Sequence, residues 1–200
     1  MLGDNDFLAG DCCTIADMFA FSMLANILFD PSIKKPEGLD QLESWSHRIR
    51  AKPYFATTHK TFFVIKNAMK AKSNGESEDP TIYMNYASPV SRSVVMIAAY
   101  LDIKINLKQL DLFKGEHKKE EYLAINPNGT VPTMVHGDVT ICQSRDIGRY
   151  LVNTFSKGNA LYPEDEEKRK QIDELLAFDD TELFPSVAKV VVSLCFTANV

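Results

Sequence analysis

The sequence predicts an α/β domain that follows an all-helical segment, and three observations support this. Up to about Lys72 the apolar residues recur at the spacing of helices. Residues 73–80 are polar, contain Gly and Pro and show no hydrophobic period, which is typical of a linker. From residue 81 onward, short apolar alternations typical of strands are separated by helical patterns. The chain therefore combines two structural classes.

The composition is that of a soluble globular protein. Of the 200 residues 45% are hydrophobic, and 22 basic against 27 acidic side chains give a net charge of −5. This balance argues against nucleic acid or an anionic membrane as the main partner. The longest apolar stretch, residues 18–29, is shorter than the roughly 20 residues that span a bilayer. No secretory signal is apparent, so we expect a cytoplasmic protein.

The helical segment begins with a capping signal. Thr14 and Asp17 have the spacing of a capping box, and the helix that follows to Phe29 is apolar on almost every face, as in the centre of a bundle. A second helix is expected from about residue 38 until Pro53 stops it. A third is expected over residues 54–72.

The α/β segment shows seven elements in the order β-α-β-α-β-β-α, which is the order of a thioredoxin-like domain. Another helix is expected from about Glu164 at least to Phe178, and the β-branched run 187–192 would ordinarily favour a strand. The seven elements are strand 81–86, helix 91–101, strand 105–112, helix 116–125, strands 133–135 and 139–142, and a helix capped by Ser144.

The loop before the third strand contains the first candidate binding site. Pro132 cannot donate to a sheet ladder, which favours a strand edge or a tight turn, with a cis peptide bond as one way to form it. The backbone of Val131 could then pair with an extended peptide like a short added strand. The alternative is an ordinary proline turn.

The junction of the last strand and its helix contains the second candidate, Gln143-Ser144-Arg145. Free backbone amides and the positive end of the helix dipole favour a carboxylate ligand there. The side chains of Gln143 and Arg145 add donors suited to the carboxylate of an amino acid. The alternative is that Ser144 only caps the helix.

Ser88, between the first strand and the first helix, is the third candidate. A hydroxyl at a helix N-terminus can donate a hydrogen bond to an anionic ligand atom. No Gly-x-Ser-x-Gly elbow surrounds Ser88, so a serine hydrolase is not expected. The alternative is a turn or cap residue. All three loops are expected at corresponding ends of the elements, where α/β folds bind ligands.

These motifs resemble, in order and spacing, the cytosolic glutathione transferases of the delta/epsilon type. The first segment resembles the C-terminal helical domain of the same family, so the family's domain order is reversed. The resemblance implies a partial helical domain at 1–72, a linker at 73–80, a glutathione-binding domain at 81–163 and the first helix of a truncated helical domain at 164–200. Its motifs are Ser88 with Arg92, Gly115-Glu116-His117, Asn126-Pro127 through Pro132, Gln143-Ser144-Arg145, Leu161-Tyr162-Pro163, Phe7 to Asp17, and the Trp45 helix running into Arg50 to Tyr54.

The resemblance implies conjugation of glutathione to small hydrophobic electrophiles, as in detoxification. Ser88 would be the catalytic residue and would favour the glutathione thiolate. Glutathione would be a co-substrate, with no other cofactor and no metal, and a homodimer is one option for assembly. The implied glutathione-binding residues are His117 at the glycyl end, Gly129, Thr130, Val131 and Pro132 around the cysteinyl unit, and Gln143, Ser144 and Arg145 at the γ-glutamyl carboxylate.

Three departures keep alternatives open. Gly129 stands where the family often has a histidine, Gln143 replaces the commoner glutamate, and a helix expected to build the electrophile pocket is absent. The chain could thus be a non-catalytic glutathione-binding module, or an inactive fragment joining two tandem transferase copies. A glutaredoxin-type oxidoreductase is disfavoured, because Ser88 stands where redox chemistry needs a cysteine.

Overall fold

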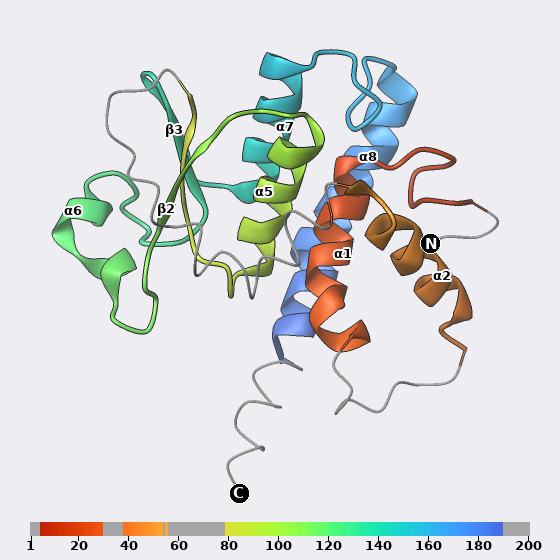
Figure 1. Ribbon diagram of the computed structural model, residues 1–200, viewed down its shortest axis with the longest axis horizontal. Helices are drawn as coiled ribbons and strands as arrows, with labels where there is room; N and C mark the ends of the chain where they lie inside the picture. Colours follow the sequence, from red (N-terminus) through yellow and green to blue (C-terminus); the bar gives the residue numbers. More distant parts are fainter. Residues whose placement is uncertain (1–4, 30–37, 54, 56–78, 190–200) are drawn as a thin grey trace, which may run out of the picture. The chain divides into compact units, whose positions relative to one another are not determined.

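The computed structural model describes residues 5–29, 38–53, 55 and 79–189 (Figure 1). Apart from residue 55, the predicted helix 54–72 lies outside the described residues, as do residues 73–78 of the predicted linker. The chain forms two compact units, one made of residues 1–49 with 158–200 and one made of residues 50–157. We call them the helical unit and the α/β unit. The division into four segments, 1–72, 73–80, 81–163 and 164–200, stays a prediction.

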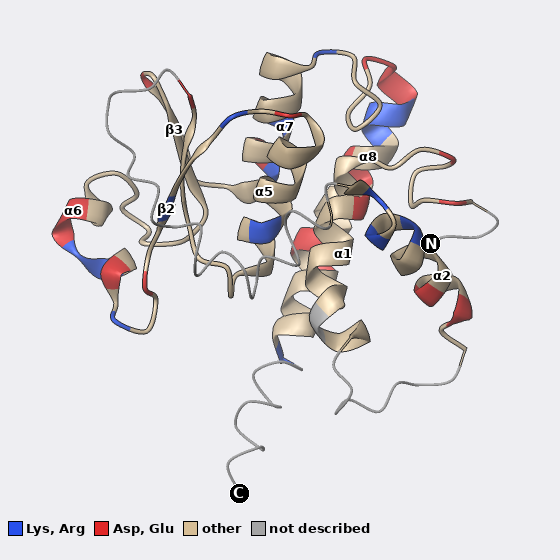
Figure 2. Ribbon diagram, in the orientation of Figure 1, with Lys and Arg blue, Asp and Glu red and all other residues tan. Residues whose placement is uncertain are grey.

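The helical unit contains α1 (Ile15–Leu28), α2 (Asp40–Arg50) and α8 (Glu166–Phe178), and a π-helical turn, η2 (Asp179–Leu183), extends α8. Helix α1 packs against α8 and η2, and Ile15 N donates a hydrogen bond of 3.0 Å to Leu161 O. As predicted, α1 is buried nearly all round, and Figure 2 shows that it has almost no charged residue. Segments from both ends of the sequence therefore share one core.

The capping box predicted at the start of α1 is confirmed. The carboxylate of Asp17 accepts hydrogen bonds from Thr14 N at 2.8 Å and from Thr14 Oγ1 at 2.9 Å. Beyond η2, residues 184–189 are helical, so the strand favoured by the β-branched run does not form in its described part. The preceding helix continues through it, because tertiary packing outweighs a weak intrinsic preference.

The α/β unit has the predicted order of elements. They are β1 (Thr81–Met84), α5 (Pro89–Tyr100), β2 (Asn106–Gln109), η1 (Glu116–Lys118), α6 (Glu120–Leu123), β3 (Thr133–His136), β4 (Val139–Ile141) and α7 (Ser144–Phe155). The sheet order is β2-β1-β3-β4, with β1 parallel to β2 and the other pairs antiparallel. Figure 1 shows α5 and α7 on one side of the sheet and α6 on the other. This is a thioredoxin-like architecture.

Two local expectations differ from the structure. The helix predicted over 116–125 is divided into a 3₁₀ turn and one short helix, with Lys119 extended between them. The prediction that Ser144 caps α7 is wrong: Gln143 is the N-cap, with extended backbone angles, and Ser144 is the first helical residue. Cap preference favours serine over glutamine, but the strand before α7 ends one residue earlier than predicted.

Candidate functional site

Strand register places the candidate loops at one edge of the sheet. Tyr83 pairs with Thr133 and Met134 with Ile141, so the end of β1, the start of β3 and the end of β4 lie together. Because β2 runs parallel to β1, the segment that follows β2 and leads to η1 begins at the same edge. The loops with Ser88, Val131 and Gln143 therefore all open onto this edge, as the sequence predicted for them.

Ser88 is the N-cap of α5. Its Oγ accepts a hydrogen bond from Ser91 N at 3.4 Å, and Pro89 occupies the first helical position, where its fixed φ suits a helix start. A hydroxyl that accepts one hydrogen bond can still donate another. In the described part of the chain no acceptor takes the Ser88 proton, so this proton is available to an external anion.

Arg92 fixes the turn that carries Ser88. Its Nη1 donates to Tyr86 O at 2.8 Å and to Ala87 O at 3.4 Å, and only 5% of the residue is exposed. Burial lowers the pKa of Arg92 to about 10, so the guanidinium remains charged at neutral pH. A buried positive charge therefore lies against the backbone immediately before Ser88.

Tyr86 is a buried residue in this turn that the sequence did not single out. Its hydroxyl has no hydrogen-bond partner among the described residues, and burial raises the pKa of Tyr86 to about 12. The hydroxyl of Ser91, which is fully buried, also has no partner in the described chain. Neither residue has a sequence signal other than its nearness to Ser88.

The Val131–Pro132 peptide bond is cis, one of the geometries that the sequence allowed. Strand β3 begins only at Thr133, and the backbone N–H and C=O of Val131 make no hydrogen bond within the described residues. A free donor and a free acceptor on one residue are what an added peptide strand requires. Val131 is therefore available for such pairing.

A buried polar network supports the loop that carries Val131. The hydroxyl of Tyr122 donates to Thr130 O at 2.5 Å and lies 2.8 Å from Thr133 Oγ1. Asn126 Nδ2 donates to the same two atoms, at 3.0 and 2.9 Å. Burial is the main cause that raises the pKa of Tyr122. The network holds the loop on its buried side, at Thr130 and Thr133, and leaves the backbone of Val131 free to pair.

Gly129, also in this loop, has φ +58°, and a Cβ on it would lie 2.7 Å from His117 O. Its N–H already donates to Asn126 O at 2.9 Å, so only its C=O is free for a ligand. His117, on η1, has a buried Nδ1 without a partner in the described chain. Glycine at position 129 lets η1 approach the loop closely.

The third set of candidate binding residues, Gln143-Ser144-Arg145, lies at the start of α7. Ser144 is only 5% exposed, Gln143 is exposed, and the Gln143 side chain does not cap the helix. The first-turn amides of a helix have no partner within the helix, and the dipole favours an anion beside them. Asp146, in the same turn, is paired with Arg149 at 2.9 Å.

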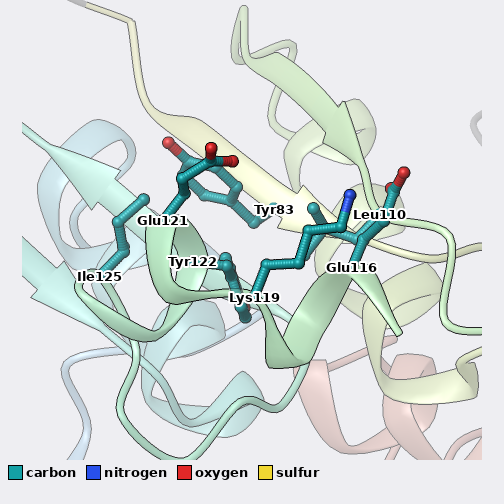
Figure 3. A pocket seen from close by; sticks show the side chains of 7 residues that line it. All are labelled: Tyr83, Leu110, Glu116, Lys119, Glu121, Tyr122 and Ile125. Atoms are coloured by element: carbon teal, nitrogen blue, oxygen red, sulfur yellow. The ribbon is translucent and has the colours of Figure 1, made fainter. Parts of the chain in front are cut away.

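A pocket of about 300 Å³ lies on the side of the sheet covered by η1 and α6 (Figure 3). None of the candidate glutathione-binding residues lines it, so the pocket is distinct from the loop edge. The rings of Tyr83 and Tyr122 form part of its wall, 5.6 Å apart. Its lining residues are Tyr83, Leu110, Glu116, Lys119, Glu121, Tyr122 and Ile125.

The described residues contain no group of three or more His, Cys, Asp or Glu side chains arranged to hold a metal ion. No helix among them combines the length and the apolar character needed to cross a bilayer.

Comparisons with known proteins agree with the α/β unit. Residues 87–154 match the family model of the glutathione S-transferase N-terminal domain. An epsilon-class glutathione S-transferase from the housefly Musca domestica superposes with a TM-score of 0.56 at 32% identity, over 60% of this chain and 56% of that one. A glutathione transferase homolog from Drosophila mojavensis, solved with bound glutathione, gives 0.51 at 37% identity, over 52% of this chain and 47% of that one.

A delta-class glutathione transferase from Nilaparvata lugens gives a TM-score of 0.53 at 32% identity, over 55% of this chain and 52% of that one. The chain thus spans about half the length of these structures. These matches support the family that the motifs of the α/β unit resemble and confirm the thioredoxin-like fold class, whereas the reversed domain order stays a prediction.

Proposed function

We propose that this chain, which contains a glutathione transferase N-terminal domain at residues 87–154, binds glutathione at the loop edge of its sheet and conjugates it to small electrophiles. The observation that supports this most strongly is the unpaired backbone of Val131 beside the cis peptide bond to Pro132. We further propose a cytoplasmic location, with glutathione as co-substrate and no other cofactor.

Val131 would bind the cysteinyl unit of glutathione. Its N–H and C=O would pair with the ligand backbone as one added strand position does. The hydroxyls and amide of Tyr122, Thr133 and Asn126 hold this loop in place before a ligand arrives. Such preorganisation reduces the entropy lost on binding.

Ser88 would stabilise the thiolate of the bound glutathione. Its hydroxyl would donate to the sulfur, and the buried charge of Arg92 and the dipole of α5 would favour an anion there. Both effects lower the thiol pKa, so the S–H proton passes to solvent at neutral pH. The thiolate then forms a carbon–sulfur bond, and in a substitution the leaving group departs with its electron pair.

The start of α7 would hold the γ-glutamyl carboxylate. The backbone amide and hydroxyl of Ser144 lie in the first turn, and the exposed amide of Gln143 can donate beside them. Arg145 adds positive charge. A carboxylate at a helix N-terminus is stabilised by both the free amides and the dipole.

The reversed domain order is part of the proposal. Helix α1 packs against α8 and η2 within the helical unit, although the α/β unit separates them in sequence. This packing favours a permuted transferase, in which the leading helices complete a helical core with the trailing one, over an inactive fragment that joins two tandem transferase copies. A homodimer stays a prediction that size-exclusion chromatography with light scattering can test.

The decisive experiment uses the full chain with glutathione and a model aryl halide. We expect Ser88→Ala to lower kcat about 10- to 100-fold, to leave the KM for glutathione nearly unchanged and to raise the pKa of the bound thiol. Ser93→Ala is the matched control, because among the described residues the Ser93 hydroxyl bonds only within α5, to Pro89 O at 3.2 Å.

Each outcome has a distinct meaning. Unchanged turnover in Ser88→Ala would remove Ser88 from the mechanism. Glutathione binding without turnover in the wild-type chain would identify a non-catalytic binding module. Failure of the wild-type chain to bind glutathione would overturn the proposed function.

A further inference from the structure

The pocket on the η1 and α6 side of the sheet has an apolar part made mostly of aromatic rings. Tyr83 and Tyr122 lie 5.6 Å apart at an interplanar angle of 50°, and Leu110 and Ile125 complete this part. Aromatic groups favour such tilted contacts, so a flat aromatic ligand can extend the pair of rings. The volume of about 300 Å³ is at the lower end of the range for ligand pockets, which indicates a small molecule.

Charged side chains of both signs complete the lining, namely Glu116, Lys119 and Glu121. Glu116 and Lys119 have the i, i+3 spacing at which helical ion pairs form, but no ion pair joins them. Nor does any other carboxylate of the described chain pair with Lys119. Figure 3 shows the charged ends of Lys119 and Glu121 apart from each other. Opposite charges therefore surround one pocket without neutralising each other.

The carboxylate of Glu116 is held by the backbone. Its Oε2 accepts a hydrogen bond from Asp111 N at 2.7 Å, and within the described residues its other oxygen stays available to a ligand. Glu121 and Lys119 are exposed, so a ligand can meet their charges from solvent. A ligand with a single charge would face one group of its own sign, whereas a ligand with an ammonium and a carboxylate can use both signs.

We propose that this pocket binds a small aromatic zwitterion, of the class of the free aromatic amino acids. The ligand ring packs on Tyr83 and Tyr122. Its ammonium lies at Glu116 and Glu121, and its carboxylate lies at Lys119. An exposed ion pair of this kind changes affinity by up to about fivefold. The inference does not depend on glutathione binding, because no candidate glutathione-binding residue lines the pocket.

The test is a saturation-transfer NMR titration of the full chain with L-tryptophan and three analogues. Tryptamine lacks the carboxylate, indole-3-propionate lacks the ammonium, and L-leucine keeps both charges but lacks the ring. We expect tryptamine and indole-3-propionate to bind about threefold to fivefold more weakly than L-tryptophan. L-leucine should bind about twofold to tenfold more weakly. Saturating glutathione should leave the Kd for L-tryptophan unchanged.

Two variants assign the charges to residues. In Lys119→Gln the preference for L-tryptophan over tryptamine should disappear, because this ammonium alone meets the ligand carboxylate. In Glu121→Gln the preference over indole-3-propionate should fall but not vanish, because Glu116 keeps part of it. Lys119 and Glu121 are both exposed, so neither change should alter the fold.

Adjacent residues supply the matched controls. Lys118→Gln and Glu120→Gln remove the same charges one position earlier, and neither residue lines the pocket. Lys118 instead donates to Asn128 O at 3.2 Å, in the loop that carries Val131. Both controls should keep the full preference for L-tryptophan. Equal losses in the controls and the pocket variants would overturn the inference, because the net charge of the chain would then explain them.

The remaining outcomes separate this inference from the proposed function. No saturation with L-tryptophan up to about 10 mM would overturn the inference. Equal Kd values for L-tryptophan, tryptamine and indole-3-propionate would also overturn it, because the charges would then not contribute. Displacement of L-tryptophan by glutathione would place the ligand at the loop edge and overturn the inference alone. Binding of L-tryptophan by a chain that does not bind glutathione would support the inference and overturn the proposed function.

Discussion

Trp45 Nε1 donates a hydrogen bond of 2.8 Å to Asp17 Oδ1, and this bond joins α2 to the first turn of α1. The same carboxylate accepts bonds from Leu8 N at 2.9 Å, Thr14 N at 2.8 Å and Thr14 Oγ1 at 2.9 Å. Asp17 is completely buried. One side chain thus connects the N-terminal loop, α1 and α2.

Replacing Asp17 should destabilise the helical unit strongly. In Asp17→Asn one carboxylate oxygen becomes an NH₂ donor that faces other donors, so the expected loss is about 2–4 kcal/mol in the free energy of unfolding. Urea unfolding of the full chain measures it. Asp11→Asn, at an exposed position, should change the same quantity by less than about 0.5 kcal/mol. Similar losses in both variants would contradict the role of the buried carboxylate.

The effect of Asp17 should also depend on pH. Desolvation raises the pKa of Asp17 above its usual 3.8, although the hydrogen bonds from Leu8, Trp45 and Thr14 oppose the rise. The folded state therefore holds this proton to a higher pH than the unfolded chain does. By linkage, the stability contributed by Asp17 is largest near and below about pH 4 and falls as the pH rises through the folded pKa.

Unfolding of wild type and Asp17→Asn between about pH 4 and pH 7 tests this pH dependence. The difference in unfolding free energy between the two proteins should shrink as the pH rises. A difference that grows over this range would show that the hydrogen bonds outweigh desolvation and that the carboxyl pKa is lowered.

Gly129→Ala should cost more than the same change at Gly137. Both glycines have nearly the same φ, +58° and +57°, but a Cβ at position 129 meets His117 O at 2.7 Å whereas one at 137 meets nothing within 4 Å. Gly137→Ala should therefore lose only the conformational preference, about 1 kcal/mol. Gly129→Ala should lose about 1–3 kcal/mol more because the backbone must move.

Chemical denaturation of the two alanine variants measures this difference directly. Equal losses would mean that η1 can shift away from the loop at little cost. The close approach of Lys118 to the loop would then not depend on Gly129.

Tyr122→Phe should destabilise the α/β unit and weaken glutathione binding. The change removes the hydroxyl that contacts Thr130 O and Thr133 Oγ1, at a cost of about 1–2 kcal/mol. Tyr83→Phe is the control, because in the described part of the chain the Tyr83 hydroxyl only accepts a 3.3 Å bond from the exposed Lys108. It should cost less than about 0.5 kcal/mol. Thermal unfolding and calorimetric titration with glutathione distinguish the two, and comparable effects would argue against the network.

The sequence predicted the α/β unit well because its signals are local. Strand alternation and the turn at Gly137 each act within a few residues, and the order of elements then leaves few topologies. The ends of helices were predicted less accurately, as at Ser144, because the cap residue depends on where the preceding strand stops.

The candidate site was predictable where a loop joins regular elements, as at Ser88, Val131 and Gln143. The supporting role of the residues behind these loops was not predicted, although Arg92 stands in the motif around Ser88. Tyr122 and Arg92 act through backbone atoms that only the folded chain brings near, and Lys118 is an exposed lysine without any pattern. The one clue in the sequence was Gly129, because a glycine in a loop often marks a residue with positive φ or a close approach of another segment to the backbone.

The bond between Ile15 and Leu161 has a consequence for biosynthesis. A ribosome releases α1 and α2 well before it makes α8, so the partner of the apolar α1 is missing while the whole α/β unit is being translated. Until α8 is made, the apolar surface of the nascent helices stays exposed. Bringing α1 and α8 together across the long segment between them is also slow. We therefore expect chaperones to hold the early chain, and α1 to become protease-resistant only after translation passes α8.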